Sequence, residues 1–396
     1  MANEKIFTLE VLKAKKGDSL MLHYGDKNSP GLVIIDGGSS GVFRSSLLPK
    51  LEEIKLERLA VKLPLIIDLI MVSHIDDDHI KGILEFIQHT KTSIGEKFKV
   101  SNLWHNSFDD IIGNRSEELQ NIATQEIGTA SLTSMSLNEC DWNNVLNKLI
   151  LASVPQGRQL ASEARGLQIP INSPFKGLIL SKNSKDPVQL TPGSDLTFKI
   201  ISPDKKEMDS LQETWDEVLE EKKLGKPIQV VEYLDKSVPN LASLVVLVEL
   251  EGKRILFTGD ARGDIILRDL KNGEYLDENG KLIVDVLKLP HHGSSNNVEQ
   301  DFFDTIVGDH YIISGDGSHG NPNVETFKML FDSRRSINQK FTIHLTYPPT
   351  EFRAHRQHDY PVQELEDLIK SEKGNGLDFN VIWPEDGKIS TSIELI

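Results

Sequence analysis

Residues 68–79 read DLIMVSHIDDDH, and the rest of the chain is interpreted outward from this stretch. The five residues 68–72 form a short apolar run of the kind that builds a buried strand. Residues 80–90 place isoleucine and leucine at helical spacing, so a helix is expected directly after the loop. The stretch therefore predicts a strand, a loop and a helix, with the polar residues gathered in the loop.

The loop contains four candidate metal ligands: His74, Asp76, Asp78 and His79. Imidazole and carboxylate are the usual ligands of catalytic divalent metals. Three acids between two histidines would repel one another without a cation. An acidic loop can also simply face water, but the position between a buried strand and a helix favours the metal site. We expect Asp77 to point away from its neighbours, toward solvent or behind the ligands.

Short strands separated by turn residues are expected on both sides of this loop. On the N-terminal side they span Ile6–Leu12, Ser19–Tyr24 and Leu32–Ile35, followed by a helix over Phe43–Leu59. On the C-terminal side they span Val100–Trp104, Leu196–Ile201, Ser243–Leu250, Arg254–Thr258, Val284–Leu289, His310–Ser314, Phe341–Thr346, Phe379–Trp383 and Lys388–Glu394. The last two are predicted to pair as a hairpin around Glu385-Asp386-Gly387.

Further metal-type residues follow other predicted strands. They are His105, Asp260 and the pair His291-His292. Strand ends in α/β folds are where sites are assembled. Read alone, Asp260 could be a turn or helix-capping residue, and His105 is a weak signal. Asp18 and Asp36 also follow strands or turns, and for both a structural turn role is favoured over one behind the ligands.

These motifs, in this order, resemble those of the metallo-β-lactamase superfamily of hydrolases. The resemblance covers early strands closing on Asp36-Gly37-Gly38, the SHIDDDH motif, His105, the TGD at 258–260 and the HHGS at 291–294. It implies an α/β fold in which two mixed sheets are flanked by helices, an αββα sandwich. We expect residues 1–396 to form one such domain, with a helical and loop insertion over 107–190.

One departure narrows the resemblance. The usual family motif is HxHxDH, whereas Asp76 makes it HxDxDH here. This is similar to the hydrolase domain of competence (DNA-uptake) proteins and to choline-phosphate esterases. Gly17-Asp18-Ser19, Asn240, Ser243 and the stretch from Ser314-Gly315 to Gly320-Asn321-Pro322 agree with that branch. A histidine usually follows the last glycine in that branch, whereas Asn321 does so here, with His319 nearby.

The resemblance implies two divalent metal ions, zinc or manganese, and a role for each motif residue. One metal would be held by His74, Asp76 and His105, and the other by Asp78, His79 and one histidine of the 291–292 pair, with His292 favoured over His291. Asp260 would bridge the two metals. The implied catalytic residues are Asp78, Asp260 and His291, with His291 as an acid or a phosphate contact. The candidate substrate contacts are His291, Ser294, His319 and Asn321.

The function expected from this set is hydrolysis by a hydroxide that two metals activate, with a phosphodiester or nucleic acid as substrate. The alternatives are a small phosphoester, ester or lactone as substrate, and a non-catalytic binding subunit on the same scaffold. A net charge of −16 argues against a broad nucleic-acid surface. The basic residues near the motifs are Lys15, Lys16 and Arg262.

Bulk composition bounds the setting of the protein. The 38% hydrophobic and 26% charged content over 396 residues is that of a globular protein. The N-terminal MANEKIFTLE lacks the features of a secretory signal, and no run is long and apolar enough to span a membrane. The single cysteine, Cys140, excludes an internal disulfide. We expect a free-standing cytoplasmic enzyme without membrane contact; its partner proteins are not predicted.

Overall fold

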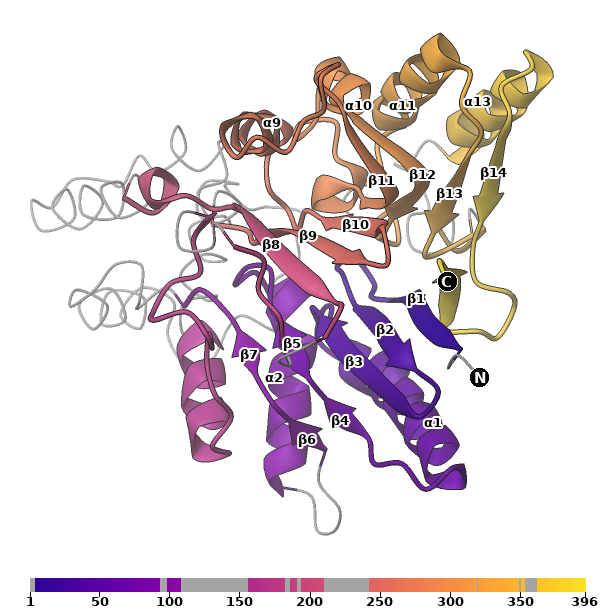
Figure 1. Ribbon diagram of the computed structural model, residues 1–396. Helices are drawn as coiled ribbons and strands as arrows, with labels where there is room; N and C mark the ends of the chain where they lie inside the picture. The colour runs from indigo at the N-terminus through magenta and orange to yellow at the C-terminus, as the bar shows by residue number, and fades with distance from the viewer. Residues whose placement is uncertain are drawn as a thin grey trace, which may run out of the picture.

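The computed structural model describes residues 4–92, 98–107, 156–181, 186–190, 194–209, 242–318, 320–348, 350–352 and 362–396. Two mixed β-sheets lie face to face, and helices cover the outer side of each (Figure 1). The expectation of two mixed sheets flanked by helices is therefore confirmed.

The first sheet has six strands, and its members come mostly from the N-terminal part of the chain. In spatial order they are β15 (Ser390–Glu394), β1 (Lys5–Leu12), β2 (Leu20–Asp26), β3 (Ser29–Ile35), β5 (Leu69–Met71) and β7 (Leu103–Trp104). The pairings from β15 to β3 are antiparallel, and β3, β5 and β7 are parallel.

The second sheet has seven strands from the C-terminal half. In spatial order they are β14 (Phe379–Ile382), β13 (Phe341–Leu345), β12 (Ile306–Ile313), β11 (Leu282–Lys288), β10 (Lys253–Phe257), β9 (Val245–Leu250) and β8 (Thr197–Ser202). Strands β10 to β14 are parallel, and β8 and β9 are antiparallel additions. A separate pair joins β4 (Ile66–Ile67) to β6 (Lys99–Val100).

Helices cover each outer face and create three apolar layers. The π-helical turn η1 (Phe43–Leu47), α1 (Leu48–Ala60), α2 (Asp77–Thr92) and a helical segment at 156–166 pack on the six-stranded sheet. The seven-stranded sheet is covered by α9 (Gly263–Asn272), α10 (Gln300–Thr305), α11 (Val324–Ile337) and α13 (Val362–Gly374). The third layer fills the space between the sheets.

Strand β3 shows how the sequence builds these layers. Val33 and Ile35 belong to the layer between the sheets, whereas Leu32 and Ile34 belong to the layer under α1 and α2. Successive strand residues point to opposite faces, so a strand buried on both sides needs a continuous apolar run. Burial of each such side chain contributes about 1.5–3 kcal/mol.

Two strand predictions were wrong. Phe379–Trp383 and Lys388–Glu394 do not form a hairpin, because β14 pairs with β13 and β15 pairs with β1 in the other sheet. Each takes the open edge of a different sheet, which the local turn signal does not reveal. The predicted strand Val100–Trp104 is divided into β6 and β7, which belong to different sheets.

Parts of the insertion lie outside the described residues. The segment predicted over 107–190 is described only at 107, 156–181 and 186–190. Cys140 and Asn240 also lie outside the described residues. No helix in the described ranges has the length and apolar character needed to cross a bilayer.

Candidate metal centre

Most of the predicted metal ligands lie close together at one edge of the two sheets. Asp36 follows β3 and His74 follows β5, while Asp260 follows β10 and His292 follows β11. These are all parallel strands, so their carboxyl ends lie at the same edge of each sheet. Residues from both halves of the chain are thereby brought together between the sheets.

The first turn of α2 brings the second half of the HIDDDH motif into this site. Asp77 and Asp78 begin the helix, and His79 is fully buried. The turn that precedes β2 packs on this helix start so closely that a Cβ on Gly17 would lie 1.8 Å from the Asp78 carbonyl oxygen. Only glycine fits there, and the close approach carries Asp18 beneath the site.

The Asp260 carboxylate lies at the centre of the cluster, close to four histidines. Its Oδ1 lies 3.3 Å from His79 Nε2, and its Oδ2 lies 3.7 Å from His74 Nε2 and 3.6 Å from His292 Nε2. His291 Nε2 lies 3.8 Å from the same Oδ2. These separations exceed ordinary hydrogen bonds, and they leave room for a cation among the groups.

Four of these atoms are buried without a hydrogen-bond partner in the described part of the chain. They are Nε2 of His74, His79 and His292, and Oδ1 of Asp260. A buried polar atom left without a partner costs about 1–3 kcal/mol, so four at one point need an explanation. Imidazole nitrogen and carboxylate oxygen are suitable donors for zinc or manganese, and a divalent cation at this point would satisfy them.

A layer of carboxylates behind the imidazoles fixes their orientation. Asp36 Oδ2 lies 2.8 Å from His79 Nδ1, and the same carboxylate accepts hydrogen bonds from the backbone N–H and the hydroxyl of Ser73, both at 2.7 Å. Asp18 Oδ1 lies 3.3 Å from His292 Nδ1 and accepts a hydrogen bond from the Ser314 hydroxyl. With Nδ1 engaged, each Nε2 is directed to the centre.

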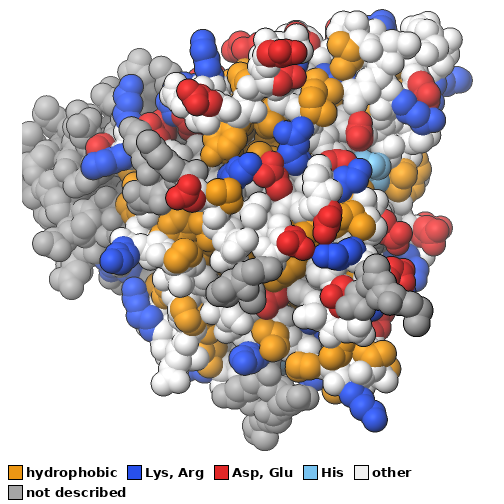
Figure 2. Space-filling view, in the orientation of Figure 1, with side chains coloured by type: hydrophobic (Ala, Val, Ile, Leu, Met, Phe, Trp, Pro, Cys, Tyr) orange, Lys and Arg blue, Asp and Glu red, His pale blue; other side chains and the backbone are white. Residues whose placement is uncertain are grey.

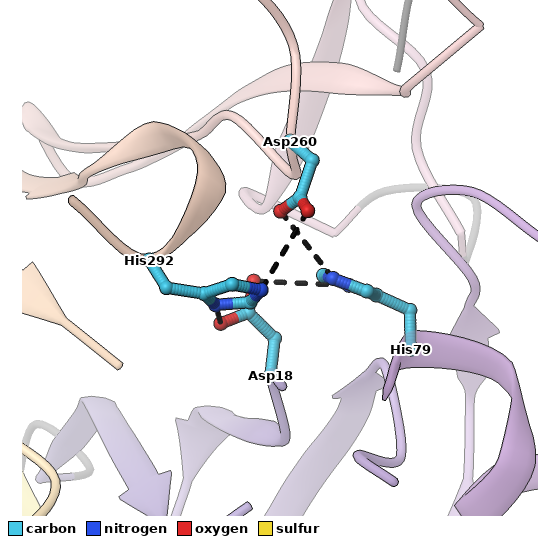
Figure 3. A group of neighbouring side chains, drawn as sticks. All are labelled: Asp18, His79, Asp260 and His292. Atoms are coloured by element: carbon cyan, nitrogen blue, oxygen red, sulfur yellow. Dashed lines mark ion pairs between the residues drawn. The ribbon is translucent and has the colours of Figure 1, made fainter. Parts of the chain in front are cut away.

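Asp18, His79, Asp260 and His292 form a group whose potential ligand atoms all lie within 4.8 Å of one another. Figure 3 shows Asp260 and Asp18 approaching the two imidazole rings from different directions. Because Asp18 faces the Nδ1 atoms, we place it behind the histidines rather than among the ligands. The expectation that Asp18 and Asp36 are turn residues was wrong: both are 1% exposed and contact the site histidines.

Lys288 is the least expected member of this second layer. It is the last residue of β11, its side chain is 1% exposed, and its ammonium pairs with Asp18. Its Nζ also donates to the Gly259 carbonyl at 3.3 Å. A buried lysine needs such partners, because an unpaired charge is costly in the interior.

The backbone is strained where the second histidine pair enters the site. His291 and His292 have φ angles of 47° and 55°, in the left-handed region that non-glycine residues avoid. Such conformations cost of order 1 kcal/mol or more each and persist where the surroundings hold them. This turn directs His292 inward, where it is 4% exposed, and leaves the side chain of His291 33% exposed.

The electrostatics suit a site that binds a cation. Burial, followed by the neighbouring His79, lowers the pKa of His74 to about 3, so this imidazole is neutral and can ligate. Burial opposes the shift, but His292 and His79 hold the pKa of Asp260 well below its usual range. Burial and the neighbouring carboxylates Asp78 and Asp260 raise the pKa of Asp76 to about 7.

The structure places the other predicted residues unevenly. Asp76 Oδ2 is 3.7 Å from His74 Nε2, and Asp78 Oδ2 is 3.8 Å from His292 Nε2, so both acids border the cluster. Ser294 is 5% exposed, and Asn321 donates to the His291 carbonyl oxygen at 3.3 Å, which supports the histidine turn. His319 lies outside the described residues.

His105 and Asp77 both lie against the start of the helical segment at 156–166. His105 lies outside the group of four, and its Nε2 would be 3.3 Å from a Cβ on Gly157. Asp77 accepts a hydrogen bond of 2.5 Å from the Gln156 amide. Asp77 therefore holds part of the insertion beside the site, and the predicted ligand role of His105 stays a prediction.

Sequence reasoning missed Ser73, Lys288 and Ser314 as members of the site. A lysine that ends the apolar strand LIVDVLK was a usable signal, because such a side chain needs a buried acid as partner. The partner itself is 270 residues away, at Asp18, and only the tertiary fold reveals it.

Comparisons with known proteins give distant structural likenesses. No protein-family model matches the chain, and no curated protein matches it in sequence. Among solved structures, the metallo-β-lactamase fold protein YhfI from Bacillus subtilis aligns at 10% identity and a TM-score of 0.35, over 99% of this chain and 100% of that one. Zinc-bound PqqB from Methylobacterium extorquens aligns at 12% identity and a TM-score of 0.39, over 98% and 100%. CmlA β-hydroxylase aligns at 9% identity and a TM-score of 0.36, over 98% of this chain and 54% of that one. These values are too low to say what this chain does.

Proposed function

We propose that the protein is a metal-dependent hydrolase that cleaves a phosphodiester with water. The observation that carries the proposal is the convergence of three buried imidazole Nε2 atoms and Oδ1 of Asp260, none of which has a hydrogen-bond partner in the described residues. His74, His79, His292 and Asp260 would hold the metal, with Asp76 and Asp78 at its two sides. The pair of divalent ions implied by the sequence motifs, zinc or manganese, remains part of this proposal.

The reaction requires water to attack phosphorus, one P–O bond to break and the leaving oxygen to gain a proton. When bound, divalent metal ions lower the pKa of water toward neutrality and stabilise charge on the phosphoryl oxygens. Asp78 stays ionised, because His79 and His292 lower its pKa despite burial, and it can accept a proton from water.

We propose His291 as the residue that contacts the substrate. Its side chain is the more exposed of the histidine pair, and its Nε2 lies beside the Asp260 carboxylate. Burial is the largest effect on its pKa and lowers it, so the ring is neutral near pH 7. A neutral imidazole donates one N–H, and this favours a contact to a phosphoryl oxygen over proton donation to the leaving group.

The choice of a phosphodiester rests on the resemblance of the HxDxDH motif to competence-type hydrolases and choline-phosphate esterases. The charge distribution argues for a short substrate. The chain carries a net charge of −16, and on the face in Figure 2 basic side chains are interspersed with acidic ones. Long nucleic acids are held by basic tracks, so a small phosphodiester fits better.

A test incubates the purified protein with manganese and three substrates: bis(p-nitrophenyl) phosphate, single-stranded DNA and double-stranded DNA. Asp260→Ala is the inactive variant, and Asp264→Ala, which removes an exposed carboxylate four residues away, is the matched control. The proposal predicts cleavage by the wild type and Asp264→Ala but not by Asp260→Ala. If the wild type binds metal but cleaves none of the three substrates, the phosphodiesterase assignment is contradicted. That result would favour an ester or lactone substrate, or a binding role.

A further inference from the structure

A cavity lies at the opposite end of β3 from the metal centre. It has a volume of about 480 Å³ and is bordered by the β2–β3 turn, the end of α1, β4 and the residues before β8. This volume is within the range of small-molecule sites. The β3 residues that line it, Ser29 to Gly31, are five to seven positions from Asp36; at about 3.3 Å per residue, the two sites are roughly 15–25 Å apart. In Figure 1, β2, β3, β4 and α1 lie in the lower part of the molecule.

Arg58 places a buried positive charge in the wall of this cavity. It lies in the last turn of α1, lines the cavity and is 7% exposed. Its Nη2 donates to the Gly31 carbonyl oxygen at 3.3 Å, a long hydrogen bond. None of the described carboxylates lies within ion-pair distance of this guanidinium. A guanidinium offers five N–H donors, and a buried unpaired charge is costly, so a counter-ion is expected.

The other charged groups around the cavity are already engaged. Lys5 pairs with Asp195 at 3.1 Å and with Glu251 at 3.2 Å. Asp68 Oδ2 accepts hydrogen bonds of 3.0 Å from the Tyr24 hydroxyl and the Leu32 N–H.

Asp26, at the β2–β3 turn, accepts from the backbone N–H groups of Asn28 and Ser29. Among the described cations that line the cavity, the Arg58 guanidinium is thus the one without an ion pair. Burial lowers its pKa, and Asp68 opposes this from beyond ion-pair distance.

The remaining walls indicate what accompanies the anionic group. Leu63, Pro64, Ile66 and Leu250 present apolar surface to the cavity. Asp26 and Asp195 at its border would repel a polyanion. The cavity therefore suits an organic molecule with one charged group and an apolar body.

We propose that this cavity binds a small organic anion whose phosphate or carboxylate group pairs with Arg58 and whose apolar body lies against Leu63, Pro64 and Ile66. The planar guanidinium can bind either group through two parallel hydrogen bonds. The site is separate from the metal centre and does not depend on the hydrolase function.

The test is calorimetric titration of the full chain with phenyl phosphate and with benzoate, and with benzyl alcohol as the uncharged probe. Three proteins are compared: the wild type, Arg58→Met, which keeps the length of the side chain, and Asp260→Asn at the metal centre. We expect saturable binding of at least one anion to the wild type and Asp260→Asn, a loss of at least about tenfold in Arg58→Met, and no binding of benzyl alcohol. The anion that binds more tightly identifies the charged group.

A cavity-filling variant, Leu63→Trp, leaves Arg58 in place and should also weaken binding, which keeps the test usable if Arg58→Met fails to fold. Three results would overturn the proposal. The first is that neither anion binds the wild type, and the second is that binding persists in both cavity variants. The third is that binding is lost in Asp260→Asn, which would mean that the anion occupies the metal centre.

Discussion

Two clusters of metal-ligand-type side chains occur in the described part of the chain, and they differ in what supplies the positive charge. One contains Asp18, His79, Asp260 and His292, and the other contains Asp204, Glu207 and Asp269. In the second cluster, Arg268 reaches between the acids, pairing with Glu207 and, at 2.7 Å, with Asp269 Oδ1. The second cluster therefore carries its own cation.

The first cluster also contains a cation, Lys288, but this ammonium lies behind the histidines and pairs with Asp18. Nε2 of His79 and His292, Oδ1 of Asp260 and Nε2 of the neighbouring His74 have no hydrogen-bond partner in the described residues. Close spacing of acids thus does not by itself indicate a metal site. The distinguishing feature is a set of buried lone pairs that converge and remain unsatisfied.

The largest effect should follow loss of a central imidazole. His79→Ala or His292→Ala should weaken manganese and zinc binding by more than the roughly 100-fold that loss of a residue behind the ligands brings. His89→Ala, on the same helix as His79 but away from the centre, is the control. Calorimetric titration of the metal measures this. Wild-type affinity in either variant would mean that the metal, if any, binds elsewhere.

Lys288→Met should have the next largest effect, because it leaves Asp18 buried without its charged partner. Breaking a buried ion pair costs about 3–5 kcal/mol of unfolding free energy. The double variant Asp18→Asn with Lys288→Met removes both charges and should be more stable than Lys288→Met alone. Urea unfolding in a chelator gives these free energies. Additive losses in the double variant would argue against a coupled pair.

Arg268→Met should have a smaller effect and should leave the metal untouched. The Arg268 side chain is 36% exposed, so the loss of its ion pairs should cost about 1–2 kcal/mol, between the limits for surface and buried pairs. Metal affinity and hydrolysis should stay within about twofold of the wild type, since the cluster lies apart from the centre. A large fall in metal affinity would show that the two clusters are not independent.

The last prediction concerns pH, and its effect is expected to be no larger than that of Arg268→Met. Burial and a hydrogen bond with Asp204 raise the pKa of Glu207 to about 7, from an ordinary 4.5. Between these values the folded protein keeps a proton that the unfolded chain has lost, so stability falls as pH rises through this window. Glu207→Gln should remove this part of the slope, on the order of 1–2 kcal/mol. Unfolding free energies measured at pH 5 and pH 7.5 would test it, and an unchanged slope would contradict the assignment.

The comparison also shows which parts of the site were predictable. The strand, loop and helix around His74 to His79 follow from local periodicity, and Asp260 and His292 follow from their positions after apolar strands. The residues behind them could not be found in this way. Asp18 meets Ser314 across 296 positions of sequence, and no local pattern encodes that contact.

For the fold, too, the local elements were largely predictable from the sequence, but the long-range pairing of strands was not. Buried strands were located within a few residues, because apolar runs between turn residues are a strong local signal. Helices α9 and α11 were not predicted, although Phe327, Leu330 and Phe331 of α11 have helical spacing. The pairing of β14 and β15 was wrong, because a turn sequence favours a hairpin locally while two open sheet edges compete for the same strands.

The most direct test of the contrast between the clusters is the metal content of three proteins: the wild type, Asp260→Asn and Asp269→Asn. Each protein is incubated with manganese or zinc and desalted, and its bound metal is measured by inductively coupled plasma mass spectrometry. We expect one or two ions per chain in the wild type and in Asp269→Asn, and essentially none in Asp260→Asn. Metal retained by Asp260→Asn, or lost from Asp269→Asn alone, would contradict the account.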